Sequence, residues 1–171
     1  MDFAELVLAR RSVRSFANMP IAPDKLDALL AAVARTPTAG NLQAFHVYVV
    51  HDERCREDLA AASHQQMFVA DAPVVLVFCA SPERSAPRYA DRGRELYSVQ
   101  DATIACTYAM LSATDLGLSS VWIGAFDDDA VAEAVDAPDS LKPVALLPIG
   151  FAAEAPALTD RRSVEEFTTP I

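Results

Sequence analysis

The chain has 171 residues, of which 52% are hydrophobic and 22% are charged, and its formal net charge at pH 7 is -10. This length suits one domain with its own core, over 1–171, and the hydrophobic fraction argues against disorder. The negative charge disfavours nucleic-acid binding, because a phosphate backbone needs a basic face. No apolar run approaches the roughly 20 residues that span a membrane, so we expect no membrane association.

Hydrophobic periodicity predicts helices and strands along the whole chain. In chain order we expect helices over 2–10 and 24–35, a turn-rich loop over 36–44, a strand over 45–51, a helix capped by Asp52, a short helical stretch over 65–70, a strand over 73–80, a helix over 94–116, a strand over 119–124, a helix begun by the aspartates 127–129, and a strand over 144–151. Segment 81–92 is predicted to be mobile and polar, and 152–171 to be an extended tail. This order indicates an α+β or α/β fold with a central sheet of about four strands.

The long helix is rich in small side chains. They are Ala102, Ala105, Ala109, Ser112 and Ala113, and Gly117 is placed to end the helix. A helix that is apolar nearly all round must be covered, and small side chains let another helix approach closely. The helix therefore suggests the core of a homodimer, although an ordinary buried helix within one subunit explains it as well.

Three arginines and a serine stand close together near the start of this acidic chain. Arg10, Arg11, Ser12 and Arg14 can offer several guanidinium N–H groups and one hydroxyl to a single small anion. This donor set suits a phosphate monoester. The alternative is a solvated basic turn that follows the first helix. In the tail, Arg161 and Arg162 add a second pair of guanidinium groups, for which a surface salt bridge with Asp160 or Glu165 is the alternative.

Two further segments could face a flat polar ligand. In the loop, Asn41 and Gln43 carry amides that match a ring bearing both carbonyl and N–H groups. The second segment ends in Ile123, Gly124 and Ala125 just before a helix, where small residues let a ligand lie against backbone N–H groups. A turn followed by a strand explains the first segment equally well.

Several common sites are absent from the sequence. It has no GxGxxG, no GxxxxGK[ST] and no GxSxG motif, which argues against a Rossmann dinucleotide site, a P-loop and a hydrolase nucleophile elbow. The three histidines, His46, His51 and His64, lack a metal-ligand spacing, so we expect no metal site. The three cysteines, with no CxxC pair, are typical of reduced thiols in a cytoplasmic protein, and residues 1–9 lack the basic start of a signal peptide.

The order of these segments resembles the nitroreductase-like family of FMN-dependent oxidoreductases. The resemblance rests on Arg10-Arg11-Ser12-Val13-Arg14-Ser15-Phe16, Pro37-Thr38-Ala39-Gly40-Asn41-Leu42-Gln43, Ala70-Asp71-Ala72-Pro73-Val74-Val75, Gln100-Asp101-Ala102, the run from Leu116 to Phe126 and the run from Lys142 to Gly150. It implies an α+β fold with a mainly antiparallel sheet flanked by helices, in an intertwined homodimer with FMN at the interface.

The resemblance also implies roles for particular residues. Arg10, Ser12 and Arg14, with Arg11 beside them, would bind the FMN phosphate or ribityl chain, and Arg161 and Arg162 would close that site. Asn41 and Gln43 would face the flavin, Thr38 would touch the ring from the partner subunit, and backbone N–H groups near Gly124 and Ala125, after Ile123, would approach N5. The chain departs from the family at Ala44-Phe45, where Pro-Trp is common, and at Ser163-Val164 in the tail.

The activity implied is hydride transfer from NADH or NADPH, through FMN, to a nitroaromatic, quinone or similar acceptor in a ping-pong order. The flavin supplies the chemistry and needs no side-chain acid or base, so we name no catalytic residue. Two alternatives are a flavin-binding or redox-sensing protein with little turnover, and an enzyme of the same fold with another flavin reaction, such as dehalogenation, flavin destruction or enoyl reduction.

Overall fold

The computed structural model describes residues 1–171 and is built around one four-stranded sheet. The strands are β1 (Phe45–Val50), β2 (Val74–Ala80), β3 (Ser119–Ser120) and β4 (Lys142–Gly150). They are hydrogen-bonded in the order β1-β2-β4-β3, and every neighbouring pair is antiparallel. The expected α+β fold with a central, mainly antiparallel sheet is therefore confirmed.

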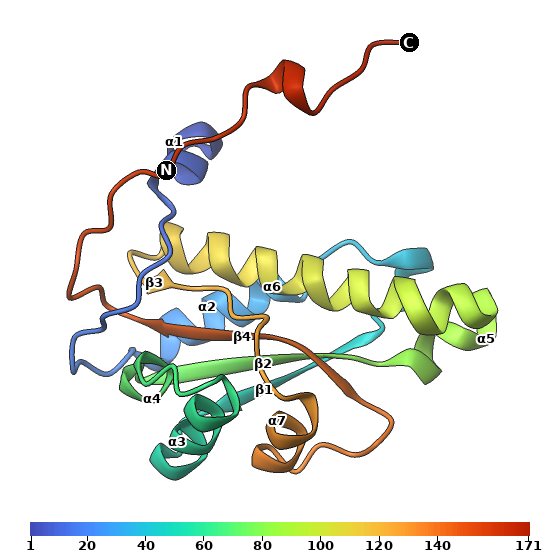
Figure 1. The fold of residues 1–171 in the computed structure, drawn as a ribbon, viewed down its shortest axis with the longest axis horizontal. Helices are drawn as coiled ribbons and strands as arrows, with labels where there is room; N and C mark the ends of the chain where they lie inside the picture. Colours follow the sequence, from blue (N-terminus) through green and yellow to red (C-terminus); the bar gives the residue numbers. More distant parts are fainter.

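Helices cover both faces of the sheet (Figure 1). The helices α2 (Pro23–Val33) and α6 (Ser98–Asp115) lie on one face, and α3 (Glu53–Ala62), α4 (Phe68–Asp71) and α7 (Asp128–Ala134) lie on the other. The remaining helices are α1 (Phe3–Ala9), α5 (Pro82–Arg92) and the short turns η1 (Ala39–Asn41), η2 (Gly93–Tyr97) and η3 (Val164–Glu166). None of the helices is both long enough and apolar enough to cross a lipid bilayer.

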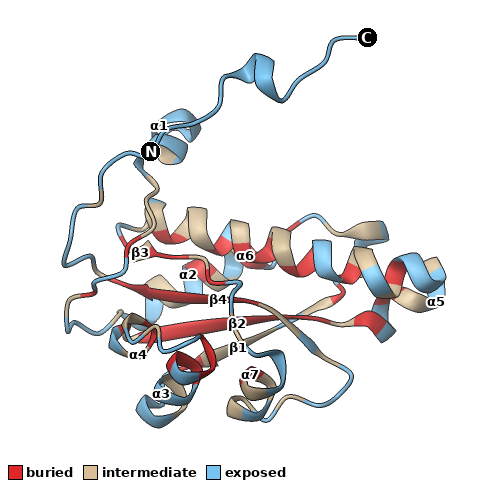
Figure 2. Cartoon of the chain, in the orientation of Figure 1, coloured by how far each residue is buried: buried red, intermediate tan, exposed pale blue.

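The core lies on both sides of β2, whose seven residues are all buried (Figure 2). Leu76 and Phe78 pack toward α2 and α6, whereas Val75 and Val77 belong to the cluster on the α3 and α7 side. Alternate side chains of a strand point to opposite faces, so one apolar strand supplies both layers. Full burial of side chains of this size stabilises the fold by about 1.5–3 kcal/mol each.

The helix ends follow the capping signals in the sequence. The Asp52 carboxylate accepts a hydrogen bond from Cys55 N at 2.9 Å, and Asp127 accepts one from Ala130 N at 2.9 Å. Gly117 has a φ of 73° just after α6, and Leu118 N donates to Ala113 O at 2.8 Å. These bonds satisfy backbone groups that a helix end leaves unpaired, which is why the three boundaries were predictable.

Segment 81–92, predicted as a mobile polar stretch without a helix, is polar but forms the helix α5 from Pro82 to Arg92. Pro82 begins the helix, where its missing N–H is not needed, but Pro87 stands inside it and hides the helical pattern. The long helix also starts later than expected, since 93–97 form the wider turn η2. The strand expected over 119–124 is reduced to β3 and a single bridge between Ile123 and Leu146, and β4 begins at 142 rather than 144.

The two ends of the chain lie outside the body of the fold (Figures 1 and 2). Helix α1 has no buried residue, and the tail from 152 onward runs past it with η3 as its one helical turn. The extended tail predicted from the sequence is therefore confirmed.

Candidate functional site

A cavity of about 350 Å³ lies where the arginine cluster of the N-terminus meets the C-terminal tail. The tail contributes a run that includes Leu158, Thr159 and Arg161. Its complete lining is Val7, Leu8, Arg10, Arg11, Ser12, Arg14, Pro156, Ala157, Leu158, Thr159 and Arg161. The structure thus brings together five of the residues predicted to bind a phosphate.

The extended segment after α1 orients this cluster. Ser12 pairs with Ser120 of β3, and Val13 N donates to Ser120 O at 3.2 Å. The Val13 side chain is buried in a small cluster with Phe16. Because successive side chains of an extended segment point to opposite sides, burial of Val13 directs Ser12 and Arg14 away from that cluster.

The cavity gathers guanidinium groups that form no ion pair, and the one carboxylate bonded at this segment, that of Glu154, accepts from the backbone N–H of Arg14. None of its four guanidinium groups has a carboxylate within 4.0 Å. Burial lowers the pKa of the Arg10 guanidinium, and the positive charges of Arg161 and Arg11 lower it further. A bound anion would relieve this repulsion, which makes the cavity a candidate anion site.

The arginines of the cavity differ in how many of their guanidinium N–H groups are already hydrogen-bonded within the chain. Arg11 donates to the carbonyl oxygens of Leu8 and Arg10, so its charge stabilises the end of α1. Arg161 donates to Thr159 Oγ1 at 2.6 Å. The side chains of Arg10 and Arg14 make no hydrogen bond within the chain and keep all their donors available. These two arginines therefore have the most N–H donors free for a ligand in this cavity.

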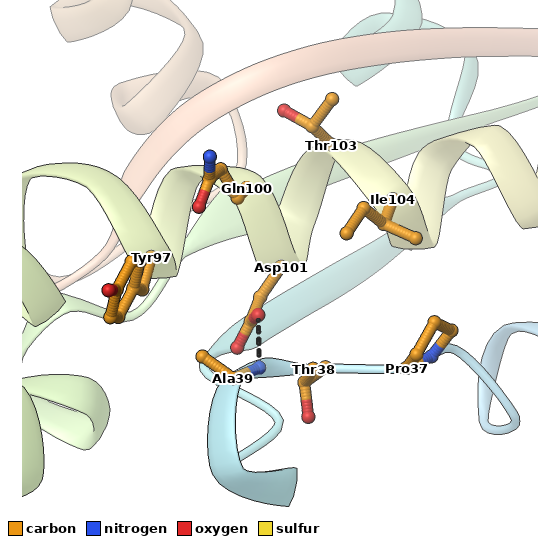
Figure 3. A pocket seen from close by; sticks show the side chains of 8 residues that line it. All are labelled: Pro37, Thr38, Ala39, Tyr97, Gln100, Asp101, Thr103 and Ile104. Carbon is orange, nitrogen blue, oxygen red and sulfur yellow. Dashed lines mark hydrogen bonds between the residues drawn. The ribbon is translucent and has the colours of Figure 1, made fainter. Parts of the chain in front are cut away.

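The loop that holds Thr38, Asn41 and Gln43 is fixed by Asp101 of α6. The Asp101 carboxylate is 2% exposed and accepts a hydrogen bond from Ala39 N at 3.0 Å (Figure 3). It accepts a second hydrogen bond from Ala44 N at 3.1 Å. It therefore holds both ends of the loop. The backbone between them turns tightly, because Gly40, Asn41 and Gln43 have φ values of 57°, 58° and 51°.

A second cavity, of about 490 Å³, lies between this loop and α6 (Figure 3). Its lining is Pro37, Thr38, Ala39, Tyr97, Gln100, Asp101, Thr103 and Ile104. Of the predicted flavin contacts only Thr38 lines it, whereas Asn41 and Gln43 are exposed nearby. Sequence reasoning assigned no role to Asp101, although an acid within an otherwise apolar helical run was a usable signal.

The segment 123–125 connects the sheet to α7. Ile123 is buried and exchanges two hydrogen bonds of 3.0 Å with Leu146, whereas Gly124 and Ala125 are exposed. A Cβ at Gly124 would lie 3.2 Å from Trp122 Nε1, so glycine suits this position. The exposed backbone here continues from Ser120, which pairs with Ser12 of the arginine cluster.

The loop and the arginine cavity lie near opposite ends of α6. Asp101 holds the loop, whereas Asp115 pairs with the N-terminal ammonium group of Met1 at 3.0 Å, beside α1. The two aspartates are fourteen positions apart, which corresponds to about 21 Å of helix. Arg162 is not in either cavity, because its guanidinium lies 5.8 Å from the Phe167 ring in the tail.

Two of the three cysteines, Cys79 and Cys106, are buried. Burial raises the pKa of the Cys79 thiol to about 12 and that of Cys106 well above its ordinary value, so both stay neutral at pH 7. No group of three His, Cys, Asp or Glu side chains is arranged to hold a metal ion. The anion cavity and the loop are therefore the features that carry the functional argument.

The comparison with protein families agrees with this geometry. The profile of the nitroreductase family matches residues 7–81 and 65–151. The chain therefore belongs to the nitroreductase family of oxidoreductases.

Individual relatives cover most of the chain. It is 31% identical over 164 residues to an FMN reductase [NAD(P)H] of Bacillus subtilis, covering 88% of this chain and 66% of that protein. It is 29% identical over 168 residues to an oxygen-insensitive NADPH nitroreductase of Salmonella typhimurium, covering 94% and 70%. The NADPH:FMN oxidoreductase of Vibrio harveyi, solved in complex with NAD+, superposes with a TM-score of 0.89 at 25% identity over 98% of this chain and 76% of that one.

Proposed function

We propose that this protein binds FMN and passes hydride from NADH or NADPH to a small acceptor such as a nitroaromatic compound or a quinone. The observation that carries the proposal is the cavity lined by Arg10, Ser12, Arg14 and Arg161, whose charges lack carboxylate partners. Guanidinium and hydroxyl donors converging on one small cavity fit a phosphate monoester, the charged end of FMN. When bound, FMN supplies the hydride-transfer chemistry.

The role of the chain's own residues would be to bind FMN and to orient it. Arg10, Arg14 and Arg161 would hold the phosphate by charge, and Ser12 would add a hydroxyl. The exposed backbone N–H groups at Gly124 and Ala125 are assigned to the flavin ring. The chain needs no side-chain acid or base, because the flavin itself accepts and donates the hydride. The nicotinamide donor and the acceptor would bind to the same face of the flavin in turn, which is a ping-pong order.

We further propose that the site is completed in a homodimer. Thr38, Asn41 and Gln43 lie near the other end of α6 from the arginine cavity, so a second copy would supply them. Apolar side chains on the two ends of the chain support this assembly, because a large exposed apolar surface marks an interaction site. They are Phe3, Val7 and Leu8 on α1, and Leu158, Val164 and Phe167 on the tail.

The test is the visible spectrum of the purified protein and its change when NADH or NADPH is added without oxygen. We expect bound FMN that bleaches with at least one nicotinamide. Bound FMN that does not bleach would favour a flavin-binding protein with little turnover. A colourless protein that cannot be reconstituted with FMN would contradict the proposal.

The phosphate assignment is tested separately by Arg14→Ala. Loss of one hydrogen bond to a charged group, about 1.5–3 kcal/mol, should weaken FMN binding by about ten- to a hundredfold. Titration of the apoprotein with FMN measures this change. Arg54→Ala is the matched control, since Arg54 lies on α3 and lines neither of the two cavities described above. An unchanged affinity in the Arg14 variant would overturn the assignment.

A further inference from the structure

Helix α5 carries three exposed arginines without acidic partners. Arg84, Arg88 and Arg92 have no carboxylate within 4.0 Å. Two of the nearby acids are engaged elsewhere, because Arg94 binds Glu83 at 3.3 Å and Asp91 at 3.2 Å, and the third, Glu95, lies more than 4.0 Å from all three guanidinium groups. In a chain with 24 acidic and 14 basic residues, three neighbouring unpaired arginines form a local excess of positive charge.

These arginines contact the loop and the tyrosine that border the 490 Å³ cavity, and they lie just outside its lining. Arg84 Nε donates to Leu42 O at 2.6 Å, and an Arg88 guanidinium N–H donates to Gly40 O at 3.4 Å, so both contact the loop that follows Thr38. Arg92 Nε donates to the Tyr97 hydroxyl at 2.9 Å, and Tyr97 lines the cavity.

The same contacts fix the guanidinium groups and leave most of their donors free. Each guanidinium has five N–H donors, and each of these three uses one in a bond within the chain. The Arg88 and Arg92 guanidinium carbons also lie 5.3 Å from the ring centres of Tyr89 and Tyr97. Carbonyl, hydroxyl and ring contacts orient an arginine but do not neutralise its charge.

The backbone between Arg88 and Arg92 is strained. Ala90 has φ 48° and ψ -136°, a conformation that side-chain-bearing residues rarely adopt. It interrupts the helix, so that Arg88 contacts the loop while Arg92 contacts Tyr97 of the following turn. The interruption thus lets two arginines of α5 contact two different elements, the loop and η2.

We propose that Arg84, Arg88 and Arg92 bind the phosphate groups of the nicotinamide dinucleotide that serves as electron donor. The inference rests on the proposed function and adds to it the residues that recognise the donor. A dinucleotide carries two phosphate groups, and the 2′-phosphorylated form carries three, which suits a row of guanidinium groups that can each form paired hydrogen bonds. The donor's phosphates would lie against α5, beside the loop that borders the cavity.

The experiment uses the FMN-loaded protein with Arg88→Gln and Arg92→Gln combined, and Arg54→Gln as a control for charge. Calorimetry with ADP and with adenosine 2′,5′-bisphosphate reads phosphate binding without any redox step. We expect the double variant to bind at least one of these about tenfold more weakly. The KM for the matching nicotinamide should rise to a similar extent, with kcat within twofold and Arg54→Gln unchanged.

The two ligands separate the two phosphate sources. Weaker binding of both ligands assigns the arginines to the phosphates that NADH and NADPH share, and weaker binding of the bisphosphate alone assigns them to the 2′-phosphate. Unchanged dissociation constants and KM values would overturn the proposal. So would a raised KM confined to an anionic acceptor, because the arginines would then recognise the oxidant. Failure of the proposed function is distinguishable, since it appears in the wild type as absent FMN or absent nicotinamide oxidation.

Discussion

A single buried carboxylate determines the shape of the loop beside the cavity. Asp101 accepts hydrogen bonds from Ala39 N and Ala44 N, one with each oxygen. In Asp101→Asn one of these oxygens becomes an NH₂ group that faces an N–H donor. Leaving the buried Ala44 N–H unpaired costs about 1–3 kcal/mol, so we expect the free energy of unfolding to fall by that amount. Urea denaturation of the FMN-loaded protein measures it.

The neighbouring residue provides the control for this change. Gln100 lines the same cavity, but its side chain makes no hydrogen bond within the chain. We expect Gln100→Ala to change the free energy of unfolding by less than about 0.5 kcal/mol. Equal urea midpoints for the wild type and Asp101→Asn would show that the two hydrogen bonds do not hold the loop.

At the scale of elements, local signals predicted what local interactions determine. The sequence predicted β2 from its β-branched run, and it predicted three helix ends from the caps at Asp52, Asp127 and Gly117, because each of these signals acts within a few residues. The sequence did not predict helix α5, because Pro87 interrupts its helical pattern and because Arg84 is held by a hydrogen bond to Leu42 O, in a loop far away in the sequence. Tertiary contacts of this kind have no periodicity in the sequence.

The strained residue within α5 gives a prediction for that element. Ala90 has a positive φ that glycine adopts without steric cost. Relief of the strain, about 1–3 kcal/mol, should outweigh the extra flexibility that glycine gives the unfolded chain, about 0.5–1 kcal/mol. We therefore expect Ala90→Gly to raise the free energy of unfolding by about 1 kcal/mol. Thermal unfolding checks this, with Ala86→Gly on the regular part of α5 as a control that should destabilise.

At the scale of the molecule, the sequence indicated the parts of the site but not their arrangement. Arg10 and Arg161 are 151 positions apart, and only the folded tail places them in one cavity. The loop around Thr38 was expected near the same ligand, yet within one chain it lies near the other end of α6. A sequence motif does not say how far apart two segments lie in the folded chain. Here α6 separates the loop from the arginine cavity, so a single site that uses both segments requires a second copy of the chain.

The assembly gives the last prediction. Phe3 on α1 is 72% exposed and Phe167 in the tail is 58% exposed. If a second copy covers them, two buried charges in Phe3→Asp/Phe167→Asp should separate the subunits, because unpaired charges are costly to bury. Aspartate in the first turn of α1 suits the helix dipole, so α1 itself should persist.

Light scattering on the wild type should then give twice the chain mass of 18.4 kDa, and on the double variant one chain mass at micromolar concentration. FMN content should fall together with the dimer, because the loop around Thr38 would no longer reach the arginine cavity. Met67→Asp is the control, since Met67 is 53% exposed beside α4 on the opposite face of the sheet. A wild type that is monomeric and still retains FMN would show that one chain binds the cofactor without the second loop.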